Sequence, residues 1–195
     1  MIRLFILLTL IFYRCNPDSI SEDELKKYIT NPSNGLIKKI DKVDIVLEML
    51  YKPDDLILLQ ELDDIQDHDE RLLAIAKYDS LDYFILTIAK QGQEIESSYV
   101  NSGQFVEVIN YLGGGISEDI SLLIGDESNK VLSVAYVGSF GMANKTQVMC
   151  VFNSFLLSKH GKASIHFDDS ILGTGLNIFE FSIDQIKKTP RLKLN

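Results

Sequence analysis

The feature of this sequence that most constrains its fold is a series of short apolar runs in the C-terminal half. The runs are rich in β-branched and aromatic residues, and glycine-containing turns separate them from one another. Short strands joined by turns pair with antiparallel neighbours, because a parallel pair needs a crossover of about a dozen residues or more. We expect an antiparallel sheet to form from the runs 120–124, 130–137, 146–155, 163–168 and 176–183.

Helix signals are concentrated before residue 113. Ser21 and Glu24 form an S-x-x-E capping box, which predicts a helix that begins near Glu22. Further short helices are expected at 56–62, 70–78 and 103–112. Two runs rich in β-branched and aromatic residues are expected to be strands, at 43–51 and 81–89. The predicted fold class is therefore α+β, with mainly antiparallel sheet in the C-terminal half and short helices in the N-terminal half.

The composition of the chain limits the classes of partner that it is expected to bind. The chain has 195 residues, of which 46% are hydrophobic, so one domain can bury a core without disulfides. Its formal net charge is −9. Because binding to nucleic acid needs clustered lysine and arginine, the acidity argues against a nucleic-acid partner.

An apolar run of ten residues, Leu4 to Tyr13, stands near the start of the chain behind Arg3. A helix needs about 20 apolar residues to cross a bilayer, so this run is too short to span one. It has the length of the apolar region of a secretory signal peptide. The alternatives are an uncleaved N-terminal anchor and a segment that packs inside the domain.

Cys15 follows this run directly, and an apolar run that ends at a cysteine resembles the signal of bacterial lipoproteins. In that family the cysteine is acylated and becomes the first residue of the mature protein. The residues before it, 12–14, depart from the family's pattern of an aliphatic residue at minus three and a small one at minus one. The resemblance implies a signal peptide at 1–14, lipidation at Cys15, a tether over 15–22 and a single domain over 23–195.

Several short motifs are similar to uncharacterised lipoproteins of Bacteroidetes-type bacteria. The clearest are Asn34-Gly35-Leu36, the stretch 51–56, Phe167-Asp168-Asp169, Gly173-Thr174-Gly175 and the stretch 190–194. That family offers no assigned activity and no catalytic residues. The resemblance implies a lipid-anchored protein of the cell envelope, at the outer membrane rather than the inner one. Its partners would be membrane lipid, through acylated Cys15, and an envelope protein or glycan.

The main alternative is an envelope hydrolase that uses His166, Asp168 and Asp169. On a strand, His166 and Asp168 face the same side about 6.6 to 6.8 Å apart, which suits an acid/base pair or a metal ligand pair. The same spacing also suits the polar face of a half-exposed sheet. A hydrolase predicts that these side chains converge in a concave pocket with perturbed pKa values.

No cofactor or metal is expected. The acidic stretch 61–70 lacks the ligand order and glycine of a calcium loop, so it is predicted to be a solvated connection between helices. Cys150 lies in an apolar stretch without an adjacent cation or histidine, which favours a buried, unreactive thiol.

The function that we expect is a non-catalytic role in binding or assembly. It predicts an exposed apolar or aromatic patch, or an unpaired sheet edge. A third alternative is a glycan or small-molecule binding module, which would expose aromatic side chains along a groove. The candidates for that groove are Tyr99, Tyr111, Tyr136 and Phe140.

Overall fold

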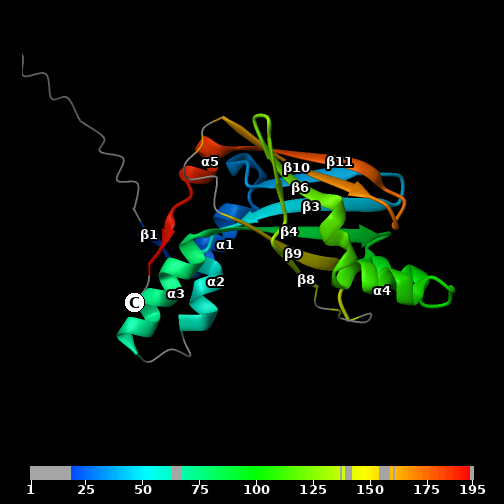
Figure 1. The fold of residues 1–195 in the computed structure, drawn as a ribbon, viewed down its shortest axis with the longest axis horizontal. Coiled ribbons are helices and arrows are strands. Elements are labelled where there is room, and N and C mark those ends of the chain that lie inside the picture. Colours follow the sequence, from blue (N-terminus) through cyan, green and yellow to red (C-terminus); the bar gives the residue numbers. More distant parts are fainter. Residues whose placement is uncertain are drawn as a thin grey trace, which may run out of the picture.

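Two antiparallel sheets pack face to face in the structure, a computed structural model (Figure 1). The structure describes residues 19–62, 67–136, 138, 142–153, 159 and 161–193. The larger sheet has the order β2 (Ile37–Asp41), β3 (Ile45–Lys52), β4 (Leu81–Lys90), β9 (Thr146–Asn153) and β8 (Ser133–Tyr136), with β5 (Gln93–Glu94) paired to β4. The smaller sheet has the order β11 (Gly175–Ser182), β10 (Lys162–Asp169), β6 (Ile120–Ile124) and β7 (Glu127–Lys130).

Helices lie at the two ends of this pair of sheets. The α-helices are α1 (Glu22–Thr30), α2 (Asp55–Leu62), α3 (His68–Asp79), α4 (Phe105–Gly113) and α5 (Ile183–Lys187). Short 3-10 helices are η1 (Pro32–Asn34), η2 (Ile95–Tyr99) and η3 (Gly115–Asp119). Figure 1 shows α2 and α3 side by side at one end and α4 at the other.

Local sequence signals account for the positions of the helices. Ser21 caps α1, where its side chain accepts a hydrogen bond from the backbone N–H of Glu24 and the Glu24 carboxylate accepts one from the backbone N–H of Ser21. This reciprocal pair is the predicted capping box. Asp67 caps α3 by accepting hydrogen bonds from the backbone N–H groups of Asp69 and Glu70. Each of these caps satisfies backbone donors that a helix leaves unpaired at its start.

Aromatic side chains fill the space between the sheets. The ring of Phe84 on β4 is fully buried and lies 5.3 Å from the ring of Phe181 on β11, which belongs to the opposite sheet. The rings of Tyr51 and Phe152, from the flanking strands β3 and β9, lie 5.4 and 6.0 Å from Phe84. Such edge-on pairs add to the free energy of burying the rings.

The α+β class is confirmed, with some differences in where the elements fall. The expected strand 130–137 is two strands in different sheets. Lys130 on β7 pairs with Ser121 of the smaller sheet, whereas Ser133 on β8 pairs with Val151 of the larger sheet. The helices are not confined to the N-terminal half, because α5 follows β11, and the strands β2, β3 and β4 come before residue 91.

The two ends of the described chain meet in a short parallel sheet. Ser19 and Ile20 form β1 and pair with β12 (Arg191–Leu192). The backbone N–H of Lys193 donates to the carbonyl oxygen of Ile20 over 2.8 Å. Ser19 and Ile20 fall within the expected tether, and the expected signal at 1–14 and Cys15 lie outside the described residues.

Candidate functional site

The three residues of the hydrolase alternative are not brought together. They lie on β10, where side chains alternate between the core and the solvent. His166 is half-buried and Asp168 is exposed, both on the outer side of the smaller sheet. Asp169 is on the opposite side, with 7% of its surface exposed. The His166 ring contacts Ser164 on the same strand, whose Oγ lies 3.4 Å from Nε2.

The carboxylate of Asp169 is occupied by the turn between β10 and β11. It accepts hydrogen bonds from the backbone N–H groups of Ile171, Leu172 and Thr174 over 3.0, 2.8 and 2.6 Å. The hydroxyl group of Thr174 donates to the same carboxylate over 2.8 Å, and the Tyr111 hydroxyl oxygen lies 3.3 Å from it. Asp169 is therefore an acceptor that shapes this turn, and these four donors leave little of its carboxylate for substrate.

The described aromatic residues of the glycan alternative lie on η2, α4 and β8, and α4 contacts both other elements, but two of the hydroxyl groups are engaged by carboxylates. The hydroxyl of Tyr111 donates to Asp119 over 2.6 Å at one end of the molecule. The hydroxyl of Tyr136 donates to the buried Glu96 over 2.8 Å. Desolvation, followed by these hydrogen bonds, raises the pKa of both phenols. Tyr99 is partly buried against the core, and Phe140 lies outside the described residues.

Cys150 is fully buried on β9. Desolvation raises the pKa of its thiol to about 12, so the thiolate is scarcely populated at neutral pH. A thiol in this environment is a poor nucleophile. The expectation of a buried side chain at this position is confirmed.

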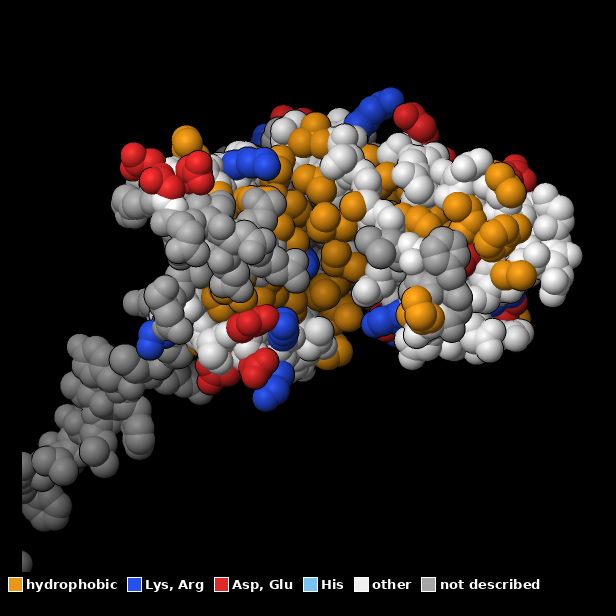
Figure 2. Space-filling view, turned by 90° about the horizontal axis from the view of Figure 1, so that it is seen from below, with side chains coloured by type: hydrophobic (Ala, Val, Ile, Leu, Met, Phe, Trp, Pro, Cys, Tyr) orange, Lys and Arg blue, Asp and Glu red, His pale blue; other side chains and the backbone are white. Residues whose placement is uncertain are grey.

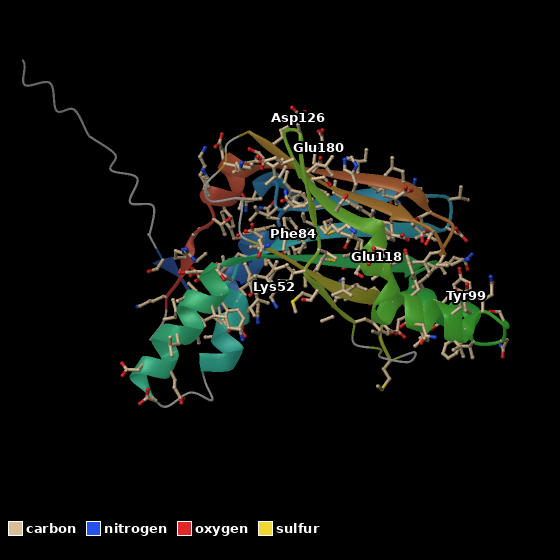
Figure 3. The ribbon with its side chains drawn as sticks, in the orientation of Figure 1. Lys52, Phe84, Tyr99, Glu118, Asp126 and Glu180 are labelled. Carbon is tan, nitrogen blue, oxygen red and sulfur yellow. The ribbon has the colours of Figure 1, made fainter. Side chains whose placement is uncertain are left out.

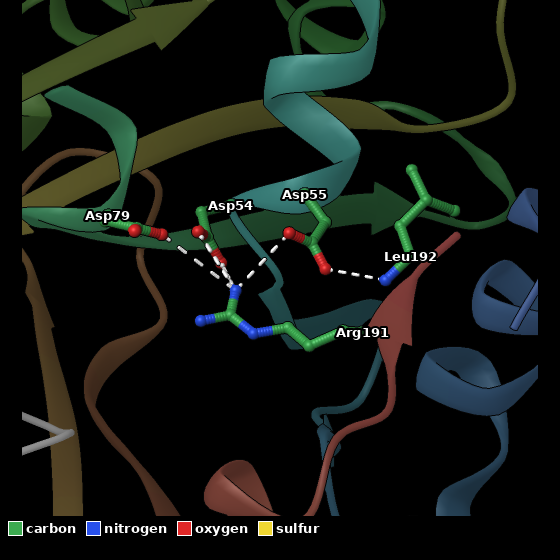
Figure 4. Close-up of polar contacts among 5 residues, drawn as sticks. All are labelled: Asp54, Asp55, Asp79, Arg191 and Leu192. Atoms are coloured by element: carbon green, nitrogen blue, oxygen red, sulfur yellow. Dashed lines mark hydrogen bonds and ion pairs between the residues drawn. The ribbon is translucent and has the colours of Figure 1, made fainter. Parts of the chain in front are cut away.

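A pocket that was not predicted lies where β12 meets α2 and α3 (Figure 4). Its volume is about 120 Å³. Arg191 donates to Asp54 and Asp55 over 3.2 and 3.3 Å and lies 4.0 Å from Asp79. Asp55 also accepts a hydrogen bond from the backbone N–H of Leu192 over 2.7 Å.

The carboxylates of this pocket shift one another's pKa values. A side-chain hydrogen bond with Asp54, followed by desolvation, raises the pKa of Asp79 to about 6. Desolvation also raises the pKa of Asp55. Arg191 and the backbone N–H of Leu192 occupy most of the acceptor oxygens of these carboxylates. Their contacts hold strand β12 against the start of α2. Only the fold brings Arg191 next to Asp54, which is 137 residues away in sequence.

A different feature stands out on the outer face of the larger sheet. Registered pairs place five apolar side chains in one row across the strands β2, β3, β4, β9 and β8. We call them the apolar row: Ile37, Leu50, Ile85, Met149 and Ala135. Four of these side chains are partly exposed and Ala135 is exposed. Neighbouring side chains that face the other sheet, such as Phe84, are fully buried.

Helices α2 and α3 cover the neighbouring part of this face. Leu58 on α2 and Tyr78 on α3 pack against Tyr83 and Val151, which form the next row of the sheet. Met149 of the apolar row borders this cluster. Figure 2 shows an apolar area in the middle of the face and charged side chains at its margins.

Lys52 lies on the same face of β3 as Leu50 but in the neighbouring row, where its register partner is Tyr83 (Figure 3). It is partly buried, and desolvation together with the charge of Lys26 lowers the pKa of its amine. Within the described ranges no carboxylate lies in ion-pair distance of Lys52. Other lysines of this sheet are paired, as with Lys39 and Asp41 at 2.9 Å.

Sequence reasoning missed the apolar row because its members are not neighbours in the chain. The alternation in 43–51 was visible, but it did not show which side of the strand would face a second sheet. Leu176 and Ile178, on the outer face of the smaller sheet, are also exposed, at 54% and 45%. They belong to one strand and do not extend into a row of apolar side chains, because His166 and Asp168 lie opposite them on β10.

Two further classes of site were considered for the described part of the chain. No group of histidine, cysteine, aspartate or glutamate there is arranged to hold a metal ion. In the acidic stretch 61–70, Asp63 and Asp64 lie outside the described residues. None of the described helices is both long enough and apolar enough to cross a membrane.

Comparisons with known proteins add no relatives to this picture. No protein-family model, curated protein or solved structure matches the chain.

Proposed function

We propose that this chain is a membrane-anchored lipoprotein of the cell envelope, lipidated at Cys15, whose domain binds another envelope component without catalysing a reaction. The observation that carries the binding role is the apolar row on the outer face of the larger sheet. A sheet that is apolar on both faces is normally covered on both. Among the described residues, α2 and α3 pack on the neighbouring row and reach Met149 of the apolar row. Partly exposed apolar side chains that lie side by side on one face support an interaction site there.

The anchor part of the proposal rests on the sequence. The apolar run Leu4 to Tyr13 and the cysteine that follows it support export and acylation. Stable attachment to a membrane takes more than one acyl chain. Mature bacterial lipoproteins resemble one another in carrying more than one. Strand β1 begins at Ser19, only a few residues after Cys15 in sequence, so an anchored domain would lie close to the membrane.

The anchor is tested by labelling cells with radioactive fatty acid. The wild type should incorporate the label and Cys15→Ala should not. Equal labelling of the two proteins would refute lipidation at Cys15. Retention of the wild type in the soluble fraction would refute the envelope placement.

The binding role is tested on the full chain, extracted from the envelope in mild detergent and separated on a native gel. The wild type should migrate in a complex, and Ile85→Lys should migrate as the free chain because a charge in the apolar row opposes burial. Ile178→Lys is the matched control, an equal change on the outer face of the smaller sheet, and should leave the complex intact. Migration of the wild type as a free chain would refute binding.

The binding proposal and the hydrolase alternative make opposite predictions for a second pair of variants, at His166 and Asp168. His166→Ala and Asp168→Ala should leave the complex and any envelope phenotype unchanged, because neither side chain is near the apolar row. Loss of the phenotype in both variants, with the complex intact, would favour catalysis over binding.

A further inference from the structure

The pairing of β1 with β12 attaches the N-terminal end of the described chain to the domain, and we call this pairing the end clasp. From the contacts on its two sides we infer that β1 leaves β12 while the rest of the domain stays folded. The contact of Arg191 with Asp54 and Asp55 keeps β12 in place for β1 to pair with it again. The consequence for a membrane anchor rests on the proposed function, whereas the opening of the end clasp does not.

Strand β12 is fixed to the domain by contacts that do not involve β1. Leu192 lies in the core with 7% of its surface exposed, and its backbone N–H donates to the buried Asp55 over 2.7 Å. Arg191 donates to Asp54 and Asp55 at the start of α2. Because these partners belong to the core and to α2, β12 keeps its position whether or not β1 is paired with it.

Strand β1 is held by fewer contacts. It consists of Ser19, which is exposed, and Ile20, which is partly buried against the core. Its backbone pairs with β12 at these two positions, and the carbonyl oxygen of Ile20 accepts a hydrogen bond from the backbone N–H of Lys193. Ordering a chain segment costs conformational entropy, and a segment with so few buried contacts opens locally, without unfolding of the core.

Helix α1 limits the opening on the C-terminal side of β1. The capping box of Ser21 and Glu24 closes its first turn, and the backbone N–H of Leu25 donates to the carbonyl oxygen of Ser21 over 2.9 Å. Leu25 and Ile29 hold the helix in the core, with 0% and 4% of their surfaces exposed. None of these contacts uses a residue of β1, so α1 stays in place when β1 leaves β12.

Opening of the end clasp changes the length of chain between Cys15 and the domain. With the end clasp closed, the chain from Cys15 to Ser19 spans at most about 14 Å. With it open, the chain from Cys15 to Glu22 spans at most about 24 Å. For a domain that is lipidated at Cys15, the end clasp therefore sets how far the domain can stand from the bilayer.

Thiol labelling of the full chain with Cys15→Ala tests the opening and needs no lipid. Ile20→Cys places a partly covered thiol in the end clasp, Ser19→Cys is the matched control with an exposed thiol in the same strand, and Cys150 reports on the core. The thiol at position 20 should react about tenfold more slowly than the thiol at position 19. It should react at least about a hundredfold faster than Cys150.

Hydrogen exchange gives a second measurement in a chain that retains Ile20. The amide hydrogen of Lys193 is bonded to Ile20 and becomes free when the end clasp opens. It should exchange about tenfold more slowly than in an unfolded chain and at least about a hundredfold faster than the amides of β4. Exchange of Lys193 at the rate of β4 would overturn the inference.

The role of Arg191 is tested by its charge. Arg191→Gln should speed the labelling at position 20 about fivefold, because β12 loses its ion pairs with α2. Lys162→Gln is the matched control, since it removes an exposed ion pair with Glu180 in the smaller sheet, and it should leave the rate unchanged. Equal rates in the two variants would overturn the role of Arg191.

The labelling rates at position 20 decide the inference. A rate equal to that of Cys150 would overturn it, because the end clasp would then open only when the whole domain unfolds. A rate equal to that at position 19 would also overturn it, because the end clasp would not be formed. Neither result bears on lipidation, which the fatty-acid label at Cys15 tests separately, so a failure of the anchor can be told from a failure of this inference.

Discussion

Asp169→Ala is expected to destabilise the domain far more than Asp168→Ala, although the two residues are adjacent and chemically identical. The buried carboxylate of Asp169 accepts hydrogen bonds from three backbone N–H groups and from the Thr174 hydroxyl at 2.6 to 3.0 Å. Asp168 is exposed on the other side of β10. The pair therefore offers a change and its control in consecutive positions.

The magnitude follows from the number and kind of these hydrogen bonds. A hydrogen bond to a charged group contributes about 1.5 to 3 kcal/mol, and a buried donor left unpaired costs about 1 to 3 kcal/mol. Because the turn relaxes and admits water, the losses do not add fully, and we expect about 3 to 5 kcal/mol for Asp169→Ala. Asp168→Ala should change the free energy of unfolding by less than about 0.5 kcal/mol.

Equilibrium unfolding in urea measures both variants. With an m value of about 2 kcal/mol/M, the midpoint should fall by about 1.5 to 2.5 M for Asp169→Ala. Asp168→Ala should unfold close to the wild type. Equal shifts in the two variants, or a shift below about 0.5 M for Asp169→Ala, would refute the structural role that we assign to this carboxylate.

Three further predictions concern the pocket, the thiol and the core. The pKa of Asp79 is raised from 3.8 to about 6 in the folded protein, so its contribution to stability is complete below about pH 4 and is lost as the pH rises through 6. Asp79→Asn should therefore flatten the fall in melting temperature between pH 4 and pH 7, and an unchanged pH profile would contradict the raised pKa. In a Cys15→Ala background, Cys150 should react with a thiol reagent only when the domain unfolds, because its side chain is fully buried; rapid labelling of the native protein would show an accessible thiol. Phe84→Ala should cost about 3 to 5 kcal/mol in a urea titration, since the ring is fully buried between the two sheets, and a loss below about 1 kcal/mol would show that other side chains fill the space.

Elements with local signals were predicted well. The capping box of Ser21 and Glu24 placed the start of α1, and Asp67 precedes α3 as an N-cap should. The predictions were wrong where pairing with a neighbouring strand decides which sheet a residue joins. The run 130–137 has strand composition throughout, yet Lys130 and Ser133 pair in different sheets, and no local property of the run marks the residue where the chain crosses over.

The candidate sites show the same difference between local sequence signals and features that depend on tertiary contacts. The pattern on β10 identified His166 and Asp168 as residues on one side of a strand, but it did not reveal that Asp169 would be surrounded by donors from the following turn. The cluster around Arg191 depends on contacts over more than a hundred residues of sequence. The steps of the apolar row from Leu50 to Ile85 and from Ile85 to Met149 also join residues that are distant in sequence.

By itself, the sequence determined the fold class and the position of most helices and strands. These properties depend on caps, turns and periodicity, which act between residues that are close in the chain. Only the tertiary structure decided which face of each strand is covered, which carboxylates come together at Arg191, and which apolar side chains form a continuous row beside Lys52. Such outcomes depend on strand order and register, and these are set by the packing of distant segments into one core.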